Sequence, residues 1–373
     1  MTDRTGPMRV LVVTIVHNPD DARIRYRQIA SLLSRGVEVT YAAPFRAFDV
    51  TTTAHSGLRV IDLPRARGKR RLQAIRKARK IIKHQARRHD VVLIHDPDLL
   101  LALLASGVKN VVWDVHEDAA AAIEAKQWVP ALLRRPARKL IRLFERWAEK
   151  RFPLLLAEYE YQDRFRRNHS VVPNTVVPAD KPAFPSNKRV VYLGSITHER
   201  GANTLCELGQ LIAHDTDSAL ELHVIGPAWD TQSELLMKQA HGAGNLVWHG
   251  FQPQTVALHQ LDGALAGLSL LQDLPNYRHS MPTKVLEYMG YGVPVITTPL
   301  PLPAKLVGDS ACGFTVPFDD ADAVFERLKQ LDTDADMAIE MGNNGWNTVK
   351  ESYDWKVGAD VFFRSLKAAA SNF

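Results

Sequence analysis

Short apolar runs alternate with longer amphipathic stretches along almost the whole chain, and this alternation constrains the fold most. Apolar runs of about four to eight residues are typical of buried parallel strands, and the stretches between them are typical of crossover helices. The pattern begins at Val10–Thr14 and restarts at Val190–Leu193. The sequence therefore predicts an α/β protein with two Rossmann-like, doubly wound domains, whose strand ends border a central cleft.

The domain boundaries follow from the same pattern. The segment 177–188 contains Pro178, Pro182 and Pro185. It shows neither the periodicity of a strand nor that of a helix, so we expect a linker there. Residues 1–176 form the first expected domain, residues 189–352 form the second, and residues 353–373 form a last helix. We also expect a helix at Ala137–Lys150, after Pro136. The pattern predicts no helix between the strands Val295–Thr297 and Gly313–Val316, where prolines interrupt the chain.

The charge of the chain is distributed unevenly. Lys and Arg outnumber Asp and Glu by 33 to 19 in residues 1–180, although the whole chain has a formal charge of only +6. The segments Arg65–Arg88 and Arg134–Arg146 hold many of these cations, and the first contains no acid. They indicate either an anionic membrane surface as partner or a merely solvated basic face. We expect no nucleic acid partner, since no recognition module is visible.

The number of cysteines and the N-terminal segment predict where the protein is located. The two cysteines, Cys206 and Cys312, are too few for a disulfide framework and are expected to be core residues. The apolar start Val10–Val16 is short and is predicted to be a strand, not a signal peptide. We therefore expect a cytoplasmic protein, peripheral at the inner membrane face.

A strand that ends in glycine opens the second half. After Val190–Leu193 come Gly194 and a short loop, and Arg200 stands at the start of the next helix. Glycine lets a ligand approach the backbone, and a guanidinium group can bind phosphate oxygens through two hydrogen bonds. The alternative is an ordinary strand-to-helix turn with a surface arginine.

A second phosphate candidate lies at Ser280–Ile296. Pro282 and Thr283 favour the start of a helix, where free N–H groups and the helix dipole attract anions. Lys284 adds a positive charge, and Glu287, one turn further, can accept hydrogen bonds from a ribose diol. This segment indicates a nucleotide diphosphate site; a capped amphipathic helix with Glu287 in a surface ion pair is the alternative.

Histidines beside acids follow two strands of the first half. His116 comes after Asp114, and His95 comes before Asp96. Each histidine is either part of a site or a structural group bound to its neighbouring carboxylate. Asp21, Arg23 and Arg25 open the first helix, and we expect a solvated helix start there, with contact to a substrate as the alternative.

Two Asp-x-Asp patterns occur, at 215–217 and at 332–334. Two aspartates at this spacing can hold a metal ion, but both copies fall near helix ends on polar stretches. We therefore expect caps and turns there, and no metal site.

At these segments the chain resembles glycosyltransferase family 4, the group 1 glycosyltransferases, which are retaining enzymes of the GT-B fold. Beyond the Gly194–Gly201 segment and the helix around Glu287, the matching segments are Val172–Asn174, His223–Gly226, Trp248–Gly250 and Tyr353–Trp355. The segments His95–Leu99 and Asp114–Asp118 look like a subgroup that builds surface polysaccharides or glycolipids.

The resemblance implies a role for each domain and for individual residues. Residues 1–176 would be the acceptor-side domain, residues 189–352 would bind the nucleotide sugar, and the last helix would cross back. Arg200 matches the residue that grips the donor diphosphate, Glu287 matches the acid that binds the ribose, and His116 lies near the reacting sugar. The expected donor contacts are Gly194, Ser195, Arg200, Gly226, His279, Pro282, Thr283, Lys284 and Glu287. The chain departs from the family pattern at His279, where an acid is usual, and at Ser195, where a basic residue is frequent.

The expected function is therefore transfer of a sugar from a nucleotide-diphosphate sugar to the hydroxyl of an acceptor sugar or lipid-linked glycan. We expect retention of configuration and no cofactor beyond the donor. Two alternatives stay open, a nucleotide-sugar epimerase of the same fold and a non-catalytic, membrane-associated nucleotide-sugar-binding protein. A dinucleotide oxidoreductase is disfavoured, because no Gly-x-Gly-x-x-Gly follows a predicted strand.

Overall fold

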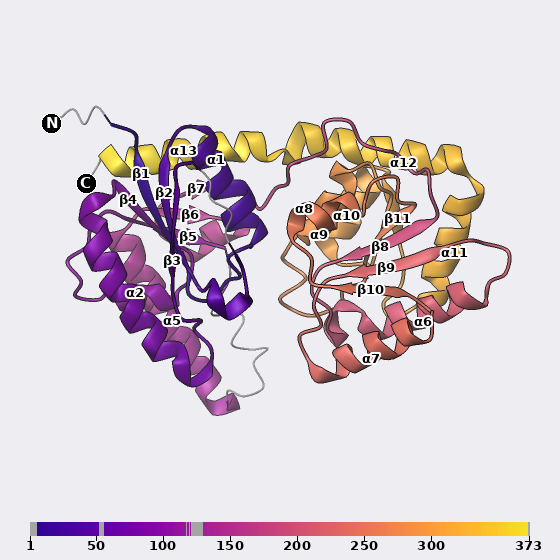
Figure 1. The fold of residues 1–373 in the computed structure, drawn as a ribbon, viewed down its shortest axis with the longest axis horizontal. Helices are drawn as coiled ribbons and strands as arrows, with labels where there is room; N and C mark the ends of the chain where they lie inside the picture. The colour runs from indigo at the N-terminus through magenta and orange to yellow at the C-terminus, as the bar shows by residue number, and fades with distance from the viewer. Residues whose placement is uncertain (1–5, 52–55, 117, 119, 121–129, 372–373) are drawn as a thin grey trace. The chain divides into compact units, whose positions relative to one another are not determined.

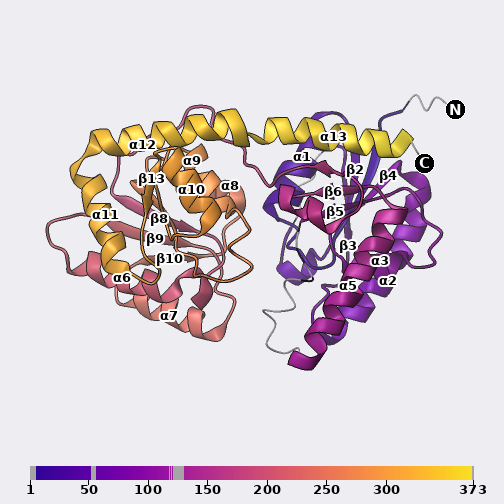
Figure 2. The same ribbon diagram turned by 180° about the vertical axis from the view of Figure 1, so that it is seen from behind.

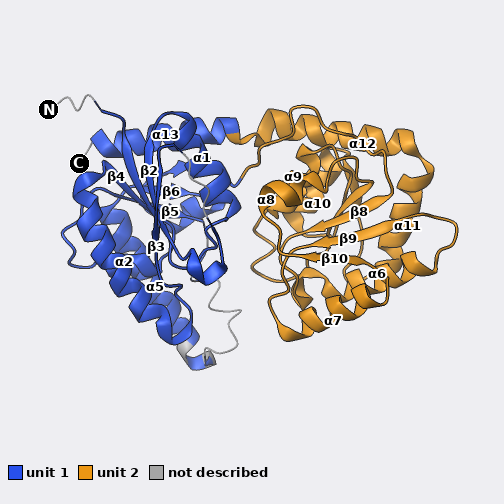
Figure 3. Cartoon of the chain, viewed as in Figure 1, with its two compact units in different colours: residues 1–174, 356–373 blue, residues 175–355 orange. Residues whose placement is uncertain are grey.

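The structure is a computed structural model, and it describes residues 6–51, 56–116, 118, 120 and 130–371. The chain divides into two compact units (Figure 3). Unit 1 comprises Met1–Asn174 with Lys356–Phe373, and unit 2 comprises Thr175–Trp355. In each unit, helices cover both faces of one parallel sheet (Figures 1 and 2).

Unit 1 contains a seven-stranded sheet in the order β3-β2-β1-β4-β5-β6-β7, and all neighbouring strands are parallel. The strand order reverses between β1 and β4, and ligands of such sheets bind beyond the strand ends at this point. The strands are β1 (Arg9–Val13), β2 (Glu38–Ala43), β3 (Leu58–Asp62), β4 (Val91–Ile94), β5 (Val111–Val115), β6 (Leu154–Leu156) and β7 (Ser170–Val171).

The helices of unit 1 include a π-helix, η1, directly after the first strand. The α-helices are α1 (Ala30–Ser34), α2 (Arg71–Gln85), α3 (Asp98–Leu103), α5 (Ala131–Arg151) and α13 (Trp355–Ser371). The π-helix is η1 (Ala22–Ile29), and the 3-10 turns are η2 (Arg46–Phe48), η3 (Gly68–Arg70), η4 (Ala86–Arg88) and η5 (Tyr159–Arg164).

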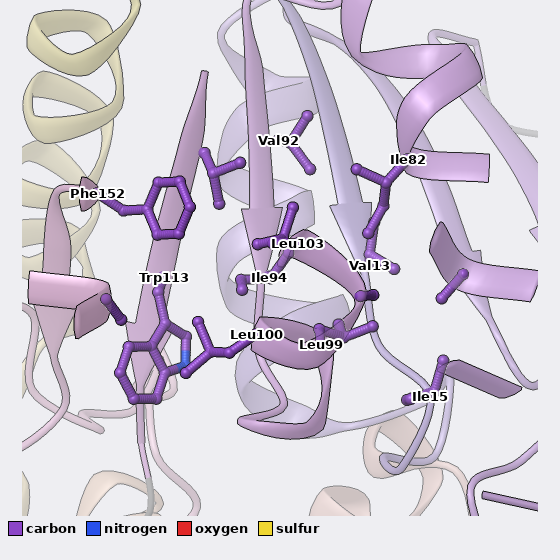
Figure 4. Close-up of a cluster of buried hydrophobic side chains, with 14 of the residues drawn as sticks. Val13, Ile15, Ile82, Val92, Ile94, Leu99, Leu100, Leu103, Trp113 and Phe152 are labelled. Atoms are coloured by element: carbon purple, nitrogen blue, oxygen red, sulfur yellow. The ribbon is translucent and has the colours of Figure 1, made fainter. Parts of the chain in front are cut away.

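The core of unit 1 lies between the sheet and its helices. Trp113 on β5, Ile94 on β4 and Val13 on β1 are all buried, and Ile82 from α2 and Leu99 from α3 pack against the same face (Figure 4). Strands covered on both faces bury every side chain, which explains their continuous apolar runs.

The last helix, α13, packs on unit 1. Phe362 and Leu366 are completely buried, and Arg35 forms an ion pair with Asp360. The helix follows the π-helix η7 of unit 2 without a loop, and Lys356 is its first residue in unit 1.

Unit 2 contains a six-stranded parallel sheet in the order β10-β9-β8-β11-β12-β13. Its strands are β8 (Arg189–Leu193), β9 (Glu221–Ile225), β10 (Val247–Gly250), β11 (Ala266–Ser269), β12 (Val295–Thr297) and β13 (Gly313–Thr315). Its helices are η6 (His198–Arg200), α6 (Ala202–His214), α7 (Thr231–Gly242), α8 (Gln254–His259), α9 (Thr283–Gly290), α10 (Pro301–Asp309), α11 (Ala321–Thr333), α12 (Ala335–Thr348) and the π-helix η7 (Val349–Tyr353).

Tyr288 fixes helix α9 on the sheet of unit 2. Its hydroxyl accepts a hydrogen bond from the backbone N–H of Leu193 (2.8 Å) and donates one to the carbonyl of Leu268 (3.0 Å). The ring lies against Gly267, where an added Cβ would be only 2.3 Å from it. The tyrosine therefore joins α9 to β8 and β11 and sets the position of the first turn of α9.

The predicted α/β fold with two doubly wound sheets is confirmed. Two helix predictions were wrong. Helix α5 begins at Ala131 and continues through Pro136, so the loss of one backbone hydrogen bond is outweighed by the packing of Ala148 and Trp147 on the core. Helix α10 was missed, although Pro301 and Pro303 lie in its first turn, where no N–H is needed.

Candidate functional site

Three adjacent strands of unit 1 end in polar residues at one sheet edge. Thr14 and His17 follow β1, and His95 and Asp96 follow β4. The fully buried Asp96 accepts a hydrogen bond from the Thr14 hydroxyl (3.0 Å), and its other oxygen lies 3.2 Å from Nε2 of His17. Asp96 thus joins the ends of β1 and β4 at the point where the strand order reverses.

Asp114, near the end of β5, is the centre of this cluster. It is fully buried, accepts two hydrogen bonds from the Arg23 guanidinium (2.9 and 2.7 Å), and accepts another from Gln28 (2.8 Å). Nδ1 of His95 lies 3.2 Å from the carboxylate, and Nδ1 of His116 lies 3.7 Å from it. Burial alone would raise the pKa of Asp114, but the charge and hydrogen bonds of Arg23 hold it well below its usual value.

His116 is held between two partners. Its Nδ1 faces Asp114, and its Nε2 lies 3.0 Å from Nε2 of His17. A carboxylate at one ring nitrogen fixes the orientation of an imidazole and leaves the other nitrogen for chemistry or binding. The His116 side chain is 13% exposed, so its ring reaches the surface at this edge. The structural interpretation of His116 and its predicted role near a substrate are therefore compatible.

The π-helix η1 supplies charged groups to the same edge. Oδ1 of Asp21 accepts hydrogen bonds from the N–H groups of Arg23 (2.9 Å) and Ile24 (3.0 Å) and so begins the helix. Burial raises the pKa of Asp21, but the electrostatic interaction with His17 and the hydrogen bond from the N–H of Ile24 lower it overall. The expectation that this helix begins in solvent is wrong for Arg23, which is 4% exposed. The low pKa keeps Asp21 charged beside the histidines.

Glu158 adds a carboxyl group whose pKa is raised. It follows β6, the neighbour of β5, and is partly buried. Burial and the negative charge of Glu160 raise its pKa to about 7, although Arg23 opposes this. The sequence analysis did not single out Glu158, because nothing in the pattern showed that its side chain would be desolvated.

His95, Asp114 and His116 lie close enough to be considered as metal ligands. Their ligand atoms are within 4.8 Å of one another. However, both carboxylate oxygens of Asp114 already accept hydrogen bonds from Arg23, whose positive charge would repel a metal ion. The residues therefore suit an ion-pair network better than a metal centre.

Two Asp-x-Asp segments have structural roles, as the sequence predicted. Asp334 caps helix α12 by accepting a hydrogen bond from the N–H of Met337 (2.9 Å). Asp215 accepts hydrogen bonds from Ser218 (2.6 Å) and Lys329 (2.7 Å) at the end of α6. Neither segment follows a buried strand.

In unit 2, the loops after β8 and β9 are in direct contact. Gly226 adopts φ +147°, and a Cβ there would be 2.0 Å from the carbonyl oxygen of Gly194. Gly194 itself has φ +112° and is exposed. Only glycine allows this approach, so the predicted donor contacts Gly194 and Gly226 lie together.

Lys284 joins this glycine contact to helix α9. The lysine is 7% exposed, and its Nζ lies 3.5 Å from the centre of the Tyr192 ring. A Cβ added to Gly194 would be 3.6 Å from the same Nζ. Within the described residues, this ammonium group has no hydrogen-bond acceptor. Burial and the charge of Arg200 lower the pKa of Lys284 well below its usual value, while Glu287 raises it.

The other predicted donor contacts surround this lysine less tightly. Arg200 is partly buried, and its guanidinium carbon lies 5.9 Å from the centre of the Tyr277 ring. Ser195 contributes its carbonyl to the Tyr192 hydroxyl (3.0 Å), and His279 is exposed on the loop before α9.

Helix α9 begins without a side-chain cap. Its N-cap residue is Pro282, followed by Thr283 at the first helical position. One turn later, the partly buried Glu287 accepts a hydrogen bond from Nε2 of Gln254 (3.0 Å), which begins α8. An uncapped helix start beside a buried lysine can bind an anion.

The structure therefore gathers the predicted residues into two groups. In unit 2, Gly194 lies against both Gly226 and Lys284, and Ser195, Arg200, Pro282, Thr283, Glu287 and His279 belong to the same unit. His116 belongs to unit 1. The sequence analysis missed Arg23 and His17 as partners in the cluster around His116, since only the strand order brings them there.

Two units, each built on one parallel, doubly wound sheet, define the fold of the protein as GT-B. Residues 177–348 match the family described as glycosyl transferases group 1. The match covers most of unit 2, and it is the sequence evidence that relates the chain to this family. No curated protein sequence matches it.

Solved structures share the fold over almost the full chain. Sucrose-phosphate synthase from Thermosynechococcus elongatus is 16% identical, with a TM-score of 0.70 over 98% of this chain and 100% of the other. HepE from Anabaena, in complex with UDP and glucose, is 11% identical, with a TM-score of 0.67 over 96% and 99%. WaaG, a glycosyltransferase involved in lipopolysaccharide biosynthesis, is 15% identical, with a TM-score of 0.65 over 97% and 98%.

Proposed function

We propose that this protein is a retaining glycosyltransferase that moves a sugar from a nucleotide-diphosphate sugar to an acceptor hydroxyl. The observation that carries the proposal is the buried ammonium group of Lys284, which extends from the first turn of α9 to the Gly194 loop. A buried charge without a hydrogen-bond acceptor is costly. A diphosphate bound at this place would compensate that charge and accept hydrogen bonds from the start of α9.

The remaining donor contacts follow from this position. Glu287 lies one turn further along α9 and would accept hydrogen bonds from the ribose hydroxyls, with Gln254 holding its carboxylate in place (3.0 Å). Arg200 would bind the phosphates from the other loop. That HepE binds UDP and glucose favours a uridine nucleotide as the donor of this chain as well.

The chemistry requires stabilisation of the negative charge that grows on the leaving phosphate. Arg200, Lys284 and the N–H groups at the start of α9 would supply fixed positive charge and hydrogen-bond donors, in the role that a metal ion has in other transferases. His116, oriented by Asp114, would position the sugar or the acceptor. Attack from the face of the leaving group would retain the configuration.

The acceptor side is proposed to meet an anionic membrane through α5. The acids Glu145 and Glu149 face the interior, while Leu132, Leu140 and Leu143 are 92%, 57% and 58% exposed. Exposed leucines among arginines and lysines are typical of helices that lie in a membrane interface. No helix within the described residues has the length and apolar composition needed to cross a bilayer. The function of WaaG in lipopolysaccharide synthesis supports a membrane-borne glycan as acceptor.

Calorimetric titration with UDP tests the donor site. The Arg200→Ala variant should bind UDP about tenfold more weakly or worse, because a charge-assisted contact is lost. Lys238→Ala, on the exposed face of α7, serves as the matched control. Unchanged UDP affinity in Arg200→Ala would move the phosphate site elsewhere. Incubation of UDP-glucose without any acceptor, followed by analysis of the sugar, separates transfer from epimerisation.

A further inference from the structure

Unit 1 contains a second basic site, separate from the histidine cluster. A groove of about 720 Å³ opens where β2 and β3 end, between their loops and the first two turns of α2. The charged side chains that line it are Arg46, Arg65, Arg67, Lys69, Arg70 and Lys77, with Asp62 as the single acid. The groove therefore carries a large excess of positive charge.

The single acid does not balance the other cations. Oδ1 of Asp62 accepts a hydrogen bond from the backbone N–H of Arg46 (3.0 Å), and its Oδ2 lies 3.7 Å from Nε of the same arginine. The carboxylate of Asp62 therefore already interacts with Arg46. The positive charges contributed by η3 and α2 have no acid of the groove facing them.

Arg65 is held in place by an aromatic ring. Its guanidinium carbon lies 4.1 Å from the centre of the Phe48 ring, a stacking contact that fixes the plane of the group. Burial lowers the pKa of Arg65, and the positive charge of Arg67 lowers it further. The cations therefore repel one another, and a bound anion would relieve this repulsion.

The backbone connects the groove to the cluster around His116. The N–H of Ala66, in the loop after β3, donates to the carbonyl of Ile15 (2.7 Å), and the N–H of Ile15 donates to the Asp96 carboxylate. In the sheet, β2 and β5 are separated by β1 and β4. With about 4.8 Å between strands, a ligand group in the groove, at the ends of β2 and β3, would lie roughly 14–19 Å from His116.

We propose that this groove binds a phosphate group of the acceptor, at a distance from its reacting hydroxyl. This inference rests on the proposed transferase function. A forked guanidinium beside several lysines and arginines suits the oxygens of a phosphate or diphosphate. The separation from His116 means that the phosphate and the reacting hydroxyl belong to different parts of an extended acceptor, such as a glycan joined through a diphosphate.

Inorganic pyrophosphate is a suitable probe, and calorimetry with the full chain can count its sites. The wild type should show two classes of site, one in the groove and one at Arg200 and Lys284. The double variant Arg67→Glu/Lys69→Glu should lose the groove class, with at least about tenfold weaker binding. Arg76→Glu/Lys80→Glu, on α2 outside the groove lining, makes the same change in net charge and should retain both classes.

The variant Arg200→Ala separates this inference from the proposed function. If it alone abolishes pyrophosphate binding while the groove variant binds normally, the groove proposal is wrong and the donor site stands. If the groove variant loses one class and Arg200→Ala loses none, the donor site is wrong and the groove stands. Equal losses in both charge-reversed variants would mean nonspecific attraction and would also overturn the groove.

Vesicles of equal parts phosphatidylcholine and phosphatidylglycerol distinguish the source of the phosphate. Normal sedimentation of the groove variant with these vesicles, together with its lost pyrophosphate site, supports an acceptor phosphate rather than a lipid headgroup. Loss of both would assign the groove to the phosphate of a lipid headgroup and would overturn the acceptor proposal. Loss of vesicle binding alone, with intact pyrophosphate binding, would contradict the proposal.

Discussion

The Nζ atom of Lys284 lies 3.5 Å from the centre of the Tyr192 ring. The Tyr192 hydroxyl donates to the carbonyls of Ser195 (3.0 Å) and Arg200 (3.1 Å), so one tyrosine holds both the loop after β8 and the lysine of α9. This contact unites two segments that are about 90 residues apart in the sequence. It makes the buried ammonium group the common point of the proposed donor site.

Replacing Lys284 should weaken UDP binding without lowering the stability of the protein. In Lys284→Met, an unpaired buried charge gives way to an apolar chain of similar length, so the free energy of unfolding should stay equal or rise by about 1 kcal/mol. UDP affinity should fall about 10- to 100-fold, because a charge-assisted contact is lost. Thermal unfolding and calorimetry measure the two effects. Lys238→Met, at an exposed site on α7, should leave UDP binding unchanged. A variant that binds UDP normally would remove Lys284 from the donor site.

The ion pair of Arg23 and Asp114 should be essential for the stability of unit 1. Asp114→Asn leaves the buried guanidinium without its carboxylate, and we expect a loss of about 3–5 kcal/mol at pH 7 in urea unfolding. The double variant Arg23→Met/Asp114→Leu should recover part of this loss, because no charge is then left buried. Asp273→Asn, which breaks an exposed pair with Arg278, should change stability little.

The ion pair of Arg23 and Asp114 should also make the free energy of unfolding depend on pH at acid pH. The pKa of Asp114 is lower in the folded protein than in the unfolded chain, so the stability it contributes is complete above the unfolded value of 3.8. This contribution is lost as the pH falls through the folded value. The acid-side slope of the unfolding free energy should be shallower in Asp114→Asn than in the wild type. Equal slopes in the two proteins would contradict the assignment.

Glu158 should make the free energy of unfolding depend on pH near neutrality, with the opposite sign to the effect of Asp114. Its pKa rises from 4.5 to about 7 on folding, so between these values the folded protein binds a proton that the unfolded chain has lost. The free energy of unfolding should therefore fall as the pH rises through this window. Glu158→Gln should be more stable than the wild type at pH 8, by about 1–3 kcal/mol, and similar at pH 4. Glu160→Gln removes a negative charge and should shift the transition to lower pH.

The exposed leucines of α5 should contribute to membrane binding. Leu140→Gln/Leu143→Gln should reduce sedimentation with vesicles that contain phosphatidylglycerol by about tenfold, since each buried leucine contributes about 1.5–3 kcal/mol at full burial. Leu235→Gln is a matched control, because Leu235 on α7 is 56% exposed. If the leucine variant sediments like the wild type, α5 is merely a solvated basic helix.

The segments of the donor site could be predicted from the sequence because their signals are local. A buried strand before Gly194, a proline at the start of a helix, and a lysine in its first turn are each visible within a few residues. The sequence did not show that Lys284 would be buried against Tyr192. Helix α10 was missed for the reverse reason, because Pro301 and Pro303 looked like breaks although they occupy a first turn.

The sequence by itself determined the class of fold, since the alternation of apolar runs and amphipathic helices is compatible with few other architectures. It also identified Arg200, Lys284 and Glu287 as candidates. Only the tertiary structure decided which distant residues meet. Arg23, His95 and His116 surround Asp114 because β1, β4 and β5 lie side by side and η1 folds back over their ends. Strand order depends on packing between segments far apart in the chain, which no local pattern records.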